Sequence, residues 1–155
     1  TSSFRFGSLN HARKLTDQTI ALWSDLLKAT PKAELALKSF SFIEASEQKR
    51  IRQRFQRGGI ESSRIPLLPW AEDHETHLAQ YNEIDVALDP IPYGGATTTA
   101  EALWMGVPVI CQHGKGMVGS LSFISTHMQR WGWWERWERP TVHPTVTHRY
   151  SHRSH

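Results

Sequence analysis

A pair of glycines followed by three threonines and a glutamate is the stretch of this sequence best suited to bind a ligand. It lies in residues 89–101 (DPIPYGGATTTAE), where the glycines let the backbone approach a ligand closely. The threonines open a helix pattern, and the free N–H groups at a helix start suit a phosphate. Glu101, one turn further on, could accept hydrogen bonds from sugar hydroxyls. A simpler interpretation stays open, in which Thr97 or Thr98 only caps the helix and Glu101 is only a first-turn acid.

Two other segments carry polar side chains that could join this one. In residues 10–14, Lys14 could meet an anion as a point charge, although a surface lysine is usually just solvated. In residues 69–77, His74 and His77 are spaced to share a helical face, but no cysteine and no third ligand supports a metal site. The sequence has neither a Walker loop nor a GxGxxG fingerprint, which removes the main support for P-loop enzymes and Rossmann dehydrogenases.

Alternating strand and helix patterns would position these three segments. Strand patterns occur at residues 4–9, 35–37, 65–68, 84–89 and 107–110, and helix patterns at 17–29, 44–57, 73–82 and 98–105. Helices that separate apolar strands so regularly predict parallel β-α-β crossovers and therefore a Rossmann-like α/β three-layer sandwich. In such a sheet ligands gather at the carboxyl ends of the strands, where all three segments fall.

The composition predicts one globular domain. The chain has 155 residues, of which 39% are hydrophobic and 21% charged, a balance that excludes wholesale disorder. Its single cysteine, Cys111, excludes an internal disulfide framework and a cysteine-based zinc site. No apolar run approaches the roughly 18 residues that cross a bilayer, and the polar start is not typical of a signal peptide. We therefore expect a soluble, cytoplasmic domain with no membrane partner.

The basic character of the chain comes from its last quarter. Residues 1–114 contain 12 Lys/Arg and 13 Asp/Glu, whereas residues 115–155 contain 6 and 2, together with four of the seven Trp and five of the nine His. Residues 123–155 show no helix or strand period, so a nucleic-acid-binding or weak metal-binding tail is one interpretation. We favour another, in which a shifted reading frame or truncation follows a domain of residues 1–122 and leaves its sheet without closing elements.

Four stretches together resemble the C-terminal catalytic half of the O-GlcNAc transferase family, glycosyltransferases usually joined to tetratricopeptide repeats. They are residues 6–14 (FGSLNHARK), 20–28 (IALWSDLLK), 77–89 (HLAQYNEIDVALD) and 90–109 (PIPYGGATTTAEALWMGVPV). The resemblance covers about residues 4–112. It implies a GT-B fold, in which two Rossmann-like domains face each other across a cleft, and it identifies this chain as the nucleotide-sugar half, incomplete at its C-terminus.

The resemblance implies phosphate and ribose roles for four residues. Lys14 matches the family's lysine that meets the UDP diphosphate, and it is the candidate catalytic residue. Thr97 and Thr98 match the phosphate-binding pair at the helix start. Glu101 matches the acidic position that holds the ribose hydroxyls.

Three further donor-binding positions follow from the same resemblance. His77 matches a histidine near the uracil, and the backbone around Ala71 borders the base. His11 stands where the family usually has an amide residue before the lysine. Ala96 stands where some members have a histidine, so both departures alter contacts to the donor.

The implied reaction is the inverting transfer of GlcNAc from UDP-GlcNAc to Ser or Thr hydroxyls of proteins, without a metal ion or other cofactor. Lys14, the helix start and the threonine hydroxyls would stabilise the negative charge that builds on the leaving UDP. A base for the protein acceptor would come from the other GT-B domain, so we expect the chain alone to be inactive. A non-catalytic nucleotide-binding remnant is the second interpretation, and a basic-tailed nucleic-acid-binding protein is the third.

Overall fold

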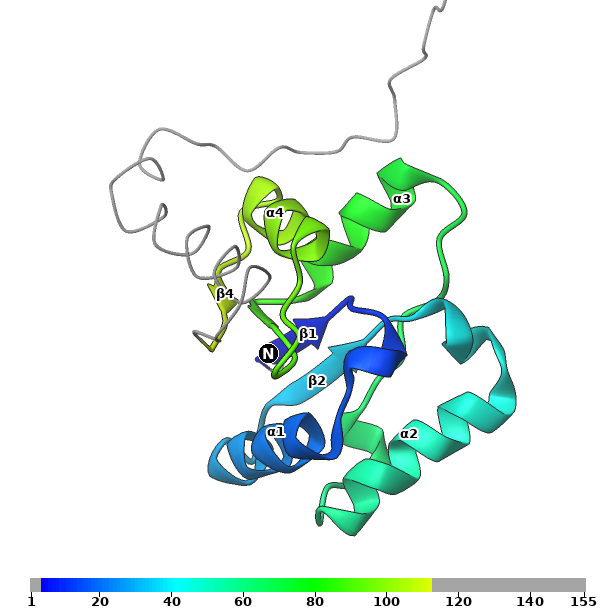
Figure 1. The fold of residues 1–155 in the computed structure, drawn as a ribbon, viewed down its shortest axis with the longest axis vertical. Coiled ribbons are helices and arrows are strands. Elements are labelled where there is room, and N and C mark those ends of the chain that lie inside the picture. The colour runs from blue at the N-terminus through cyan, green and yellow to red at the C-terminus, as the bar shows by residue number, and fades with distance from the viewer. Residues whose placement is uncertain (1–3, 113–155) are drawn as a thin grey trace, which may run out of the picture.

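A four-stranded parallel sheet forms the middle layer of residues 4–112, the part of the chain that this computed structural model describes (Figure 1). Its strands are β1 (Arg5–Ser8), β2 (Glu34–Leu37), β3 (Val86–Leu88) and β4 (Val109–Ile110), in the spatial order β2-β1-β3-β4. The expectations for the tail from residue 123, and for a domain boundary at residue 122, lie outside the described residues.

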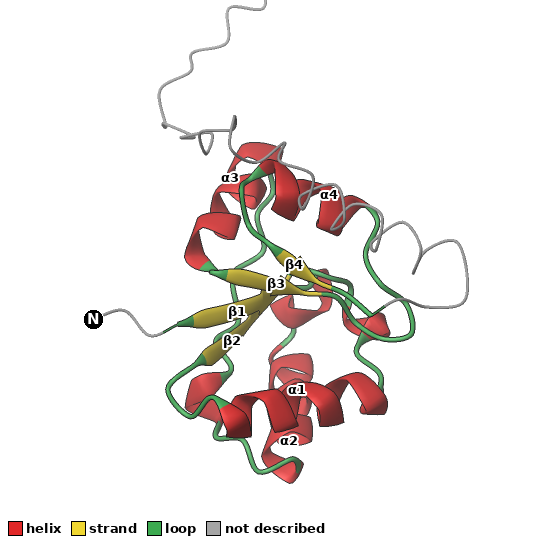
Figure 2. Cartoon of the chain, turned by 90° about the vertical axis from the view of Figure 1, so that its left-hand side faces the viewer, coloured by secondary structure: helices red, strands yellow, loops and turns green. Residues whose placement is uncertain are grey.

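Helices cover both faces of this sheet, which confirms the predicted α/β three-layer sandwich. Helices α1 (Asp17–Ala29) and α2 (Ala45–Arg57) lie against one face, and α3 (His74–Ala79) and α4 (Thr97–Trp104) lie against the other (Figure 2). None of the helices within residues 4–112 is long and apolar enough to cross a membrane.

Strand β2 shows how one strand supplies both hydrophobic cores. Leu35 and Leu37 pack in the core that contains Trp23 of α1 and Phe55 of α2. Ala36, between them, belongs to the core beneath α3 and α4. Successive side chains of a strand point to opposite faces, so a strand that is buried on both faces reads as a continuous apolar run.

Residues at their ends fix α1 and α2 close to the predicted bounds. At the start of α1 the hydroxyl of Thr16 accepts a hydrogen bond from the backbone N–H of Thr19 at 3.1 Å. After α2 the chain turns through Gly59, whose φ of +82° lies in the region that favours glycine. The glycine stop predicted for this helix is confirmed.

The strand predicted at residues 65–68 was wrong in extent. Only Leu67 forms a bridge, parallel to Leu37 on the outer side of β2. The Pro66 carbonyl accepts from Leu37 N at 2.9 Å, but a proline has no N–H with which to continue the ladder. The segment therefore pairs with β2 through one isolated bridge and forms no strand.

The helix predicted at residues 73–82 is shorter than expected. It ends at Ala79 and passes into a 3-10 turn, Gln80–Glu83. Such turns are frequent at helix ends, and this one buries Gln80 and Tyr81.

The order of the strands creates a switch point between β1 and β3. From β1 the chain moves outward to β2, and then returns to the other side of β1 to form β3 and β4. Loops that leave the carboxyl ends of β1 and β3 therefore turn to opposite sides of the sheet, and the point where they diverge is the usual ligand position in open α/β sheets.

Candidate functional site

The loops that follow β1 and β3 meet at this switch point. Lys14, in the turn after β1, donates from Nζ to the carbonyl oxygen of Gly94 at 3.2 Å. Asn10 Oδ1, from the same loop, accepts from the hydroxyl of Thr98 at 3.1 Å. The structure thus brings two predicted residues, Lys14 and Thr98, to the place where the two loops meet.

The start of α4 differs from the simple capping interpretation. Ala96 is the N-cap and has no side chain that could cap the helix, so neither Thr97 nor Thr98 has that role. The hydroxyl of Thr99 donates to two groups inside the protein, the Gly95 carbonyl at 2.7 Å and the buried carboxylate of Asp89. The first N–H groups of a helix have no partner within it, which is why a helix start is a common position for an anion.

Gly95 makes room for this arrangement. A Cβ atom at this position would overlap the Thr98 hydroxyl oxygen and lie 3.0 Å from Asn10 Oδ1. The sequence suggested that the glycine lets a ligand approach, but in the structure the side chains of Thr98 and Asn10 occupy that space.

Glu101 lies beyond the first turn of α4 and anchors a second cluster. His77 Nε2 lies 2.9 Å from Glu101 Oε2, and the Tyr81 hydroxyl donates to the same oxygen at 3.2 Å. Both partners engage Oε2, and in residues 4–112 no hydrogen bond to Oε1 is found. The structure therefore brings together His77 and Glu101, two predicted donor-binding residues.

Tyr81 remains a proton donor throughout the ordinary pH range. Burial raises the pKa of its hydroxyl above the usual value, and the nearby negative charge of Glu101 raises it further. The Tyr81 hydroxyl also lies 3.2 Å from the Thr98 carbonyl oxygen. Tyr81 therefore links the cluster around Glu101 to the first turn of α4.

Lys38 is a member of this cluster that the sequence analysis missed. It follows β2, its Nζ bonds to His77 Nδ1 at 2.7 Å and donates to Gln80 Oε1, and it lies 5.3 Å from the centre of the Trp70 ring. Burial lowers the pKa of the Lys38 ammonium, an effect that Glu101 partly offsets. Lys38 comes directly after an apolar strand, and this position could have identified it from the sequence. Asn10, just after β1, could have been identified in the same way.

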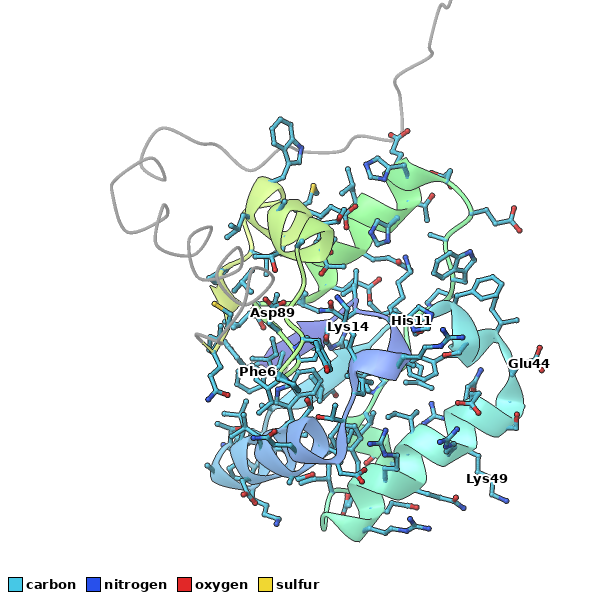
Figure 3. All side chains as sticks on the ribbon, viewed as in Figure 1. Phe6, His11, Lys14, Glu44, Lys49 and Asp89 are labelled. Atoms are coloured by element: carbon cyan, nitrogen blue, oxygen red, sulfur yellow. The ribbon has the colours of Figure 1, made fainter. Side chains whose placement is uncertain are left out.

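His11 lies on the same turn as Lys14 but has different contacts. Its Nδ1 accepts from the backbone N–H of Arg13 at 3.2 Å. The residue lines a hollow of about 560 Å³, with Phe40 and Arg50 among the other lining residues. In Figure 3 His11 lies toward the α2 side of the molecule. Its predicted contact with the donor stays a prediction.

Ala71 and His74 occupy the loop before α3 and the first turn of that helix. Ala71 is buried, and the border that its backbone is predicted to form with the base stays a prediction. The rings of His74 and His77 are 6.1 Å apart, but within residues 4–112 no three His, Cys, Asp or Glu side chains are grouped so that they could hold a metal ion.

Comparisons with known sequences relate this chain to a family of glycosyl transferases. The profile of glycosyl transferase family 41 matches residues 2–125. The probable UDP-N-acetylglucosamine–peptide N-acetylglucosaminyltransferase SPINDLY of Arabidopsis thaliana is 37% identical over 110 residues, and its Hordeum vulgare counterpart is 36% identical. The match covers 71% of this chain but only 12% of the length of each relative.

Two solved structures are similar to this chain. A mutant O-GlcNAc transferase of Thermobaculum terrenum superposes with a TM-score of 0.76 and 34% identity, over 86% of this chain and 25% of that one. The C-terminal domain of a glycosyl transferase group 1 family protein from Francisella tularensis gives a TM-score of 0.52 at 14% identity, over 83% of this chain and 74% of the other. The second likeness concerns the fold alone.

Proposed function

The chain belongs to glycosyl transferase family 41, and from this premise we propose that residues 4–112 form the donor-binding part of a protein O-GlcNAc transferase. The donor is UDP-GlcNAc, and the acceptor is a Ser or Thr hydroxyl of a protein. Because the chain spans 12% of its plant relatives and 25% of the similar O-GlcNAc transferase structure, the acceptor side belongs to parts of such an enzyme outside this chain.

The observation that carries this proposal is the meeting of Lys14 with the loop that begins α4. Lys14 Nζ is held by the neutral Gly94 carbonyl, and an ammonium group has further N–H donors to offer. Helix α4 begins at the end of the same loop. A cation next to the loop that leads into a helix start suits a diphosphate.

The cluster around Glu101 supports a sugar-binding role beside the diphosphate. Its Oε2 is held by His77 and Tyr81, so the carboxylate is oriented before a ligand arrives. A hydroxyl of the ribose would then donate to Oε1. The base would extend toward His77 and the backbone of Ala71.

The proposed chemistry follows from where charge builds up. Breaking the bond between GlcNAc and UDP leaves a negative charge on the diphosphate. Lys14 and the α4 N–H groups would stabilise that charge without reorganising, which is the usual way in which preorganised donors lower a barrier. A metal ion is not needed for this step, and the base that accepts the proton of the Ser or Thr hydroxyl would lie in the acceptor domain.

Calorimetric titration of the 155-residue chain with UDP tests this proposal. Lys14→Ala should weaken UDP binding about tenfold or more, because a hydrogen bond to a charged group is worth about 1.5–3 kcal/mol. Lys49→Ala is the matched control, because Lys49 points to solvent from α2 (Figure 3). Equal affinities of the chain and its Lys14→Ala variant would remove the diphosphate assignment.

Glu101→Ala separates the ribose from the diphosphate. The variant should bind UDP about tenfold more weakly but bind inorganic pyrophosphate as the unchanged chain does, since pyrophosphate has no ribose. A parallel loss for both ligands would mean that Glu101 only maintains the fold. Far-UV circular dichroism and a thermal melt on each variant check that it is folded.

A further inference from the structure

The Lys38 ammonium group is enclosed by protein atoms at the carboxyl end of β2. The residue is 2% exposed, and its Nζ contacts His77, Gln80 and the ring of Trp70. Burying a charge is costly, so such a group is rarely placed without a partner or a purpose. Because Lys38 is too deep to touch a ligand, any effect on binding must pass through the residues that it contacts.

The direction of these hydrogen bonds follows from the orientation of Gln80. Its Nε2 donates to the Pro69 carbonyl at 2.8 Å, so its Oε1 faces Lys38. An ammonium group has three N–H donors and no acceptor. Lys38 therefore donates both to Gln80 Oε1 and to His77 Nδ1.

This arrangement determines where His77 carries its proton. Nδ1 accepts from Lys38 and has no hydrogen of its own. Nε2 lies 2.9 Å from Glu101 Oε2, and a carboxylate oxygen can only accept, so Nε2 carries the hydrogen. His77 is thus the neutral Nε2–H tautomer, placed between an ammonium group and a carboxylate.

We propose that Lys38 is a positioning residue for donor binding: it keeps His77 neutral, and so leaves the negative charge of Glu101 available to a ligand hydroxyl. The inference rests on the proposed role of Glu101 in binding the ribose. Without Lys38, the carboxylate would draw a second proton onto His77 and form a direct ion pair with it. That pair would compete with the ligand hydroxyl for the negative charge of Glu101.

The first test needs no variant of Lys38 and no ligand. Nitrogen-15 NMR of the whole 155-residue chain at neutral pH reports which imidazole nitrogens carry hydrogen, and a His77→Asn variant identifies the His77 signals. We expect a protonated Nε2 and an unprotonated Nδ1. A doubly protonated His77, or the tautomer with hydrogen on Nδ1, overturns the proposal.

The second test removes the ammonium group. Lys38→Met should convert His77 to the doubly protonated form and weaken UDP binding about tenfold, while the affinity for inorganic pyrophosphate stays unchanged. Lys49→Met, on the exposed side of α2, is the matched control and should change none of these. Unchanged UDP affinity in a folded Lys38→Met variant, or an unchanged His77 signal, overturns the proposal.

The two tests separate this inference from the function on which it rests. If the unchanged chain binds no UDP, the proposed function fails for this chain, while the His77 signals in the absence of ligand still decide whether Lys38 sets their protonation. If Lys38→Met does not fold, the spectrum of the unchanged chain still decides whether His77 has the tautomer that the proposal requires.

Discussion

At the scale of single residues, polar side chains at the carboxyl edge of the sheet are held mostly by one another. Thr98 is held by Asn10, and Glu101 by His77 and Tyr81. Side chains held in this way lose little further freedom when a ligand binds, which lowers the entropic cost of binding. Thr98 and Glu101 are therefore held in position by neighbouring side chains before any ligand binds.

Tyr81 should make the free energy of unfolding depend on pH in the alkaline range. Its pKa is raised above the ordinary value of 10.0 by burial and by Glu101. Above about pH 10 the unfolded chain loses this proton while the folded chain keeps it, so the stabilisation is complete below pH 10 and is lost as the pH rises further. Tyr81→Phe should therefore make the free energy of unfolding less dependent on pH above 10.

Denaturant unfolding of both proteins between pH 8 and about 11 measures this effect. Tyr93→Phe is the matched control, because Tyr93 is a tyrosine that is 62% exposed. If Tyr81→Phe and the unchanged chain lose stability in parallel, the Tyr81 hydroxyl ionises as freely in the folded state as in the unfolded one.

At the scale of elements, the loop between β3 and α4 is fastened on both sides. Thr16 precedes the first turn of α1 and Thr19 lies in it, and the hydroxyls of both donate to the Ile91 carbonyl at 2.8 Å. Lys14 holds the same loop at Gly94. Helix α1 thus does two things: it fills one core of the sandwich, and it fixes the position at which α4 begins.

Gly95→Ala tests how tightly this loop is packed. The added methyl group would overlap the Thr98 hydroxyl, so we expect a loss of about 1–3 kcal/mol in the free energy of unfolding, as in other overpacked sites. Thr98→Ala removes that hydroxyl. In the double variant the added methyl group should therefore cost less, and chemical denaturation of the four proteins gives the coupling energy. Strict additivity would mean that the loop moves away freely and that the glycine is not required for packing.

At the scale of the whole molecule, residues 4–112 form one Rossmann-like half of a GT-B fold, as the sequence resemblance implied. This agrees with the similarity to an O-GlcNAc transferase structure and with the family match. The residues to which we assign donor binding lie at the carboxyl edge of the sheet. In our proposal, binding of the nucleotide belongs to this half and acceptor binding to another domain, so the two can be tested separately.

We expect the 155-residue chain alone to bind UDP but to transfer no GlcNAc to a peptide. Acceptor positioning and deprotonation need groups that we assign to another domain, and catalysis depends on holding both reactants together. Incubation with UDP-GlcNAc and an acceptor peptide, followed by mass spectrometry of the peptide, measures this. Turnover near 1 per second or faster, as in ordinary enzymes, would show that the chain carries a complete active site.

Much of this architecture could be predicted because its signals are local. Helix α1 has the predicted bounds, since apolar residues recur at helical spacing between Thr16 and Thr30. The strand at 65–68 failed for a reason that is also local, the proline that cannot continue the ladder. Parallel strands further predicted that Lys14, the α4 start and the segment before α3 would share one edge.

The sequence by itself thus determined the layers, the edge at which polar loops collect, and the family resemblance that gave residues such as Lys14 and Glu101 their proposed roles. Only the tertiary structure decided the partners: Asn10 with Thr98, and Lys38 with His77. Hydrophobic periodicity records which face of an element is buried, but it carries no information on which strand lies next to which. The contacts of Lys38 depend on how the end of β2 packs against α3, and that is settled only when the whole sandwich closes.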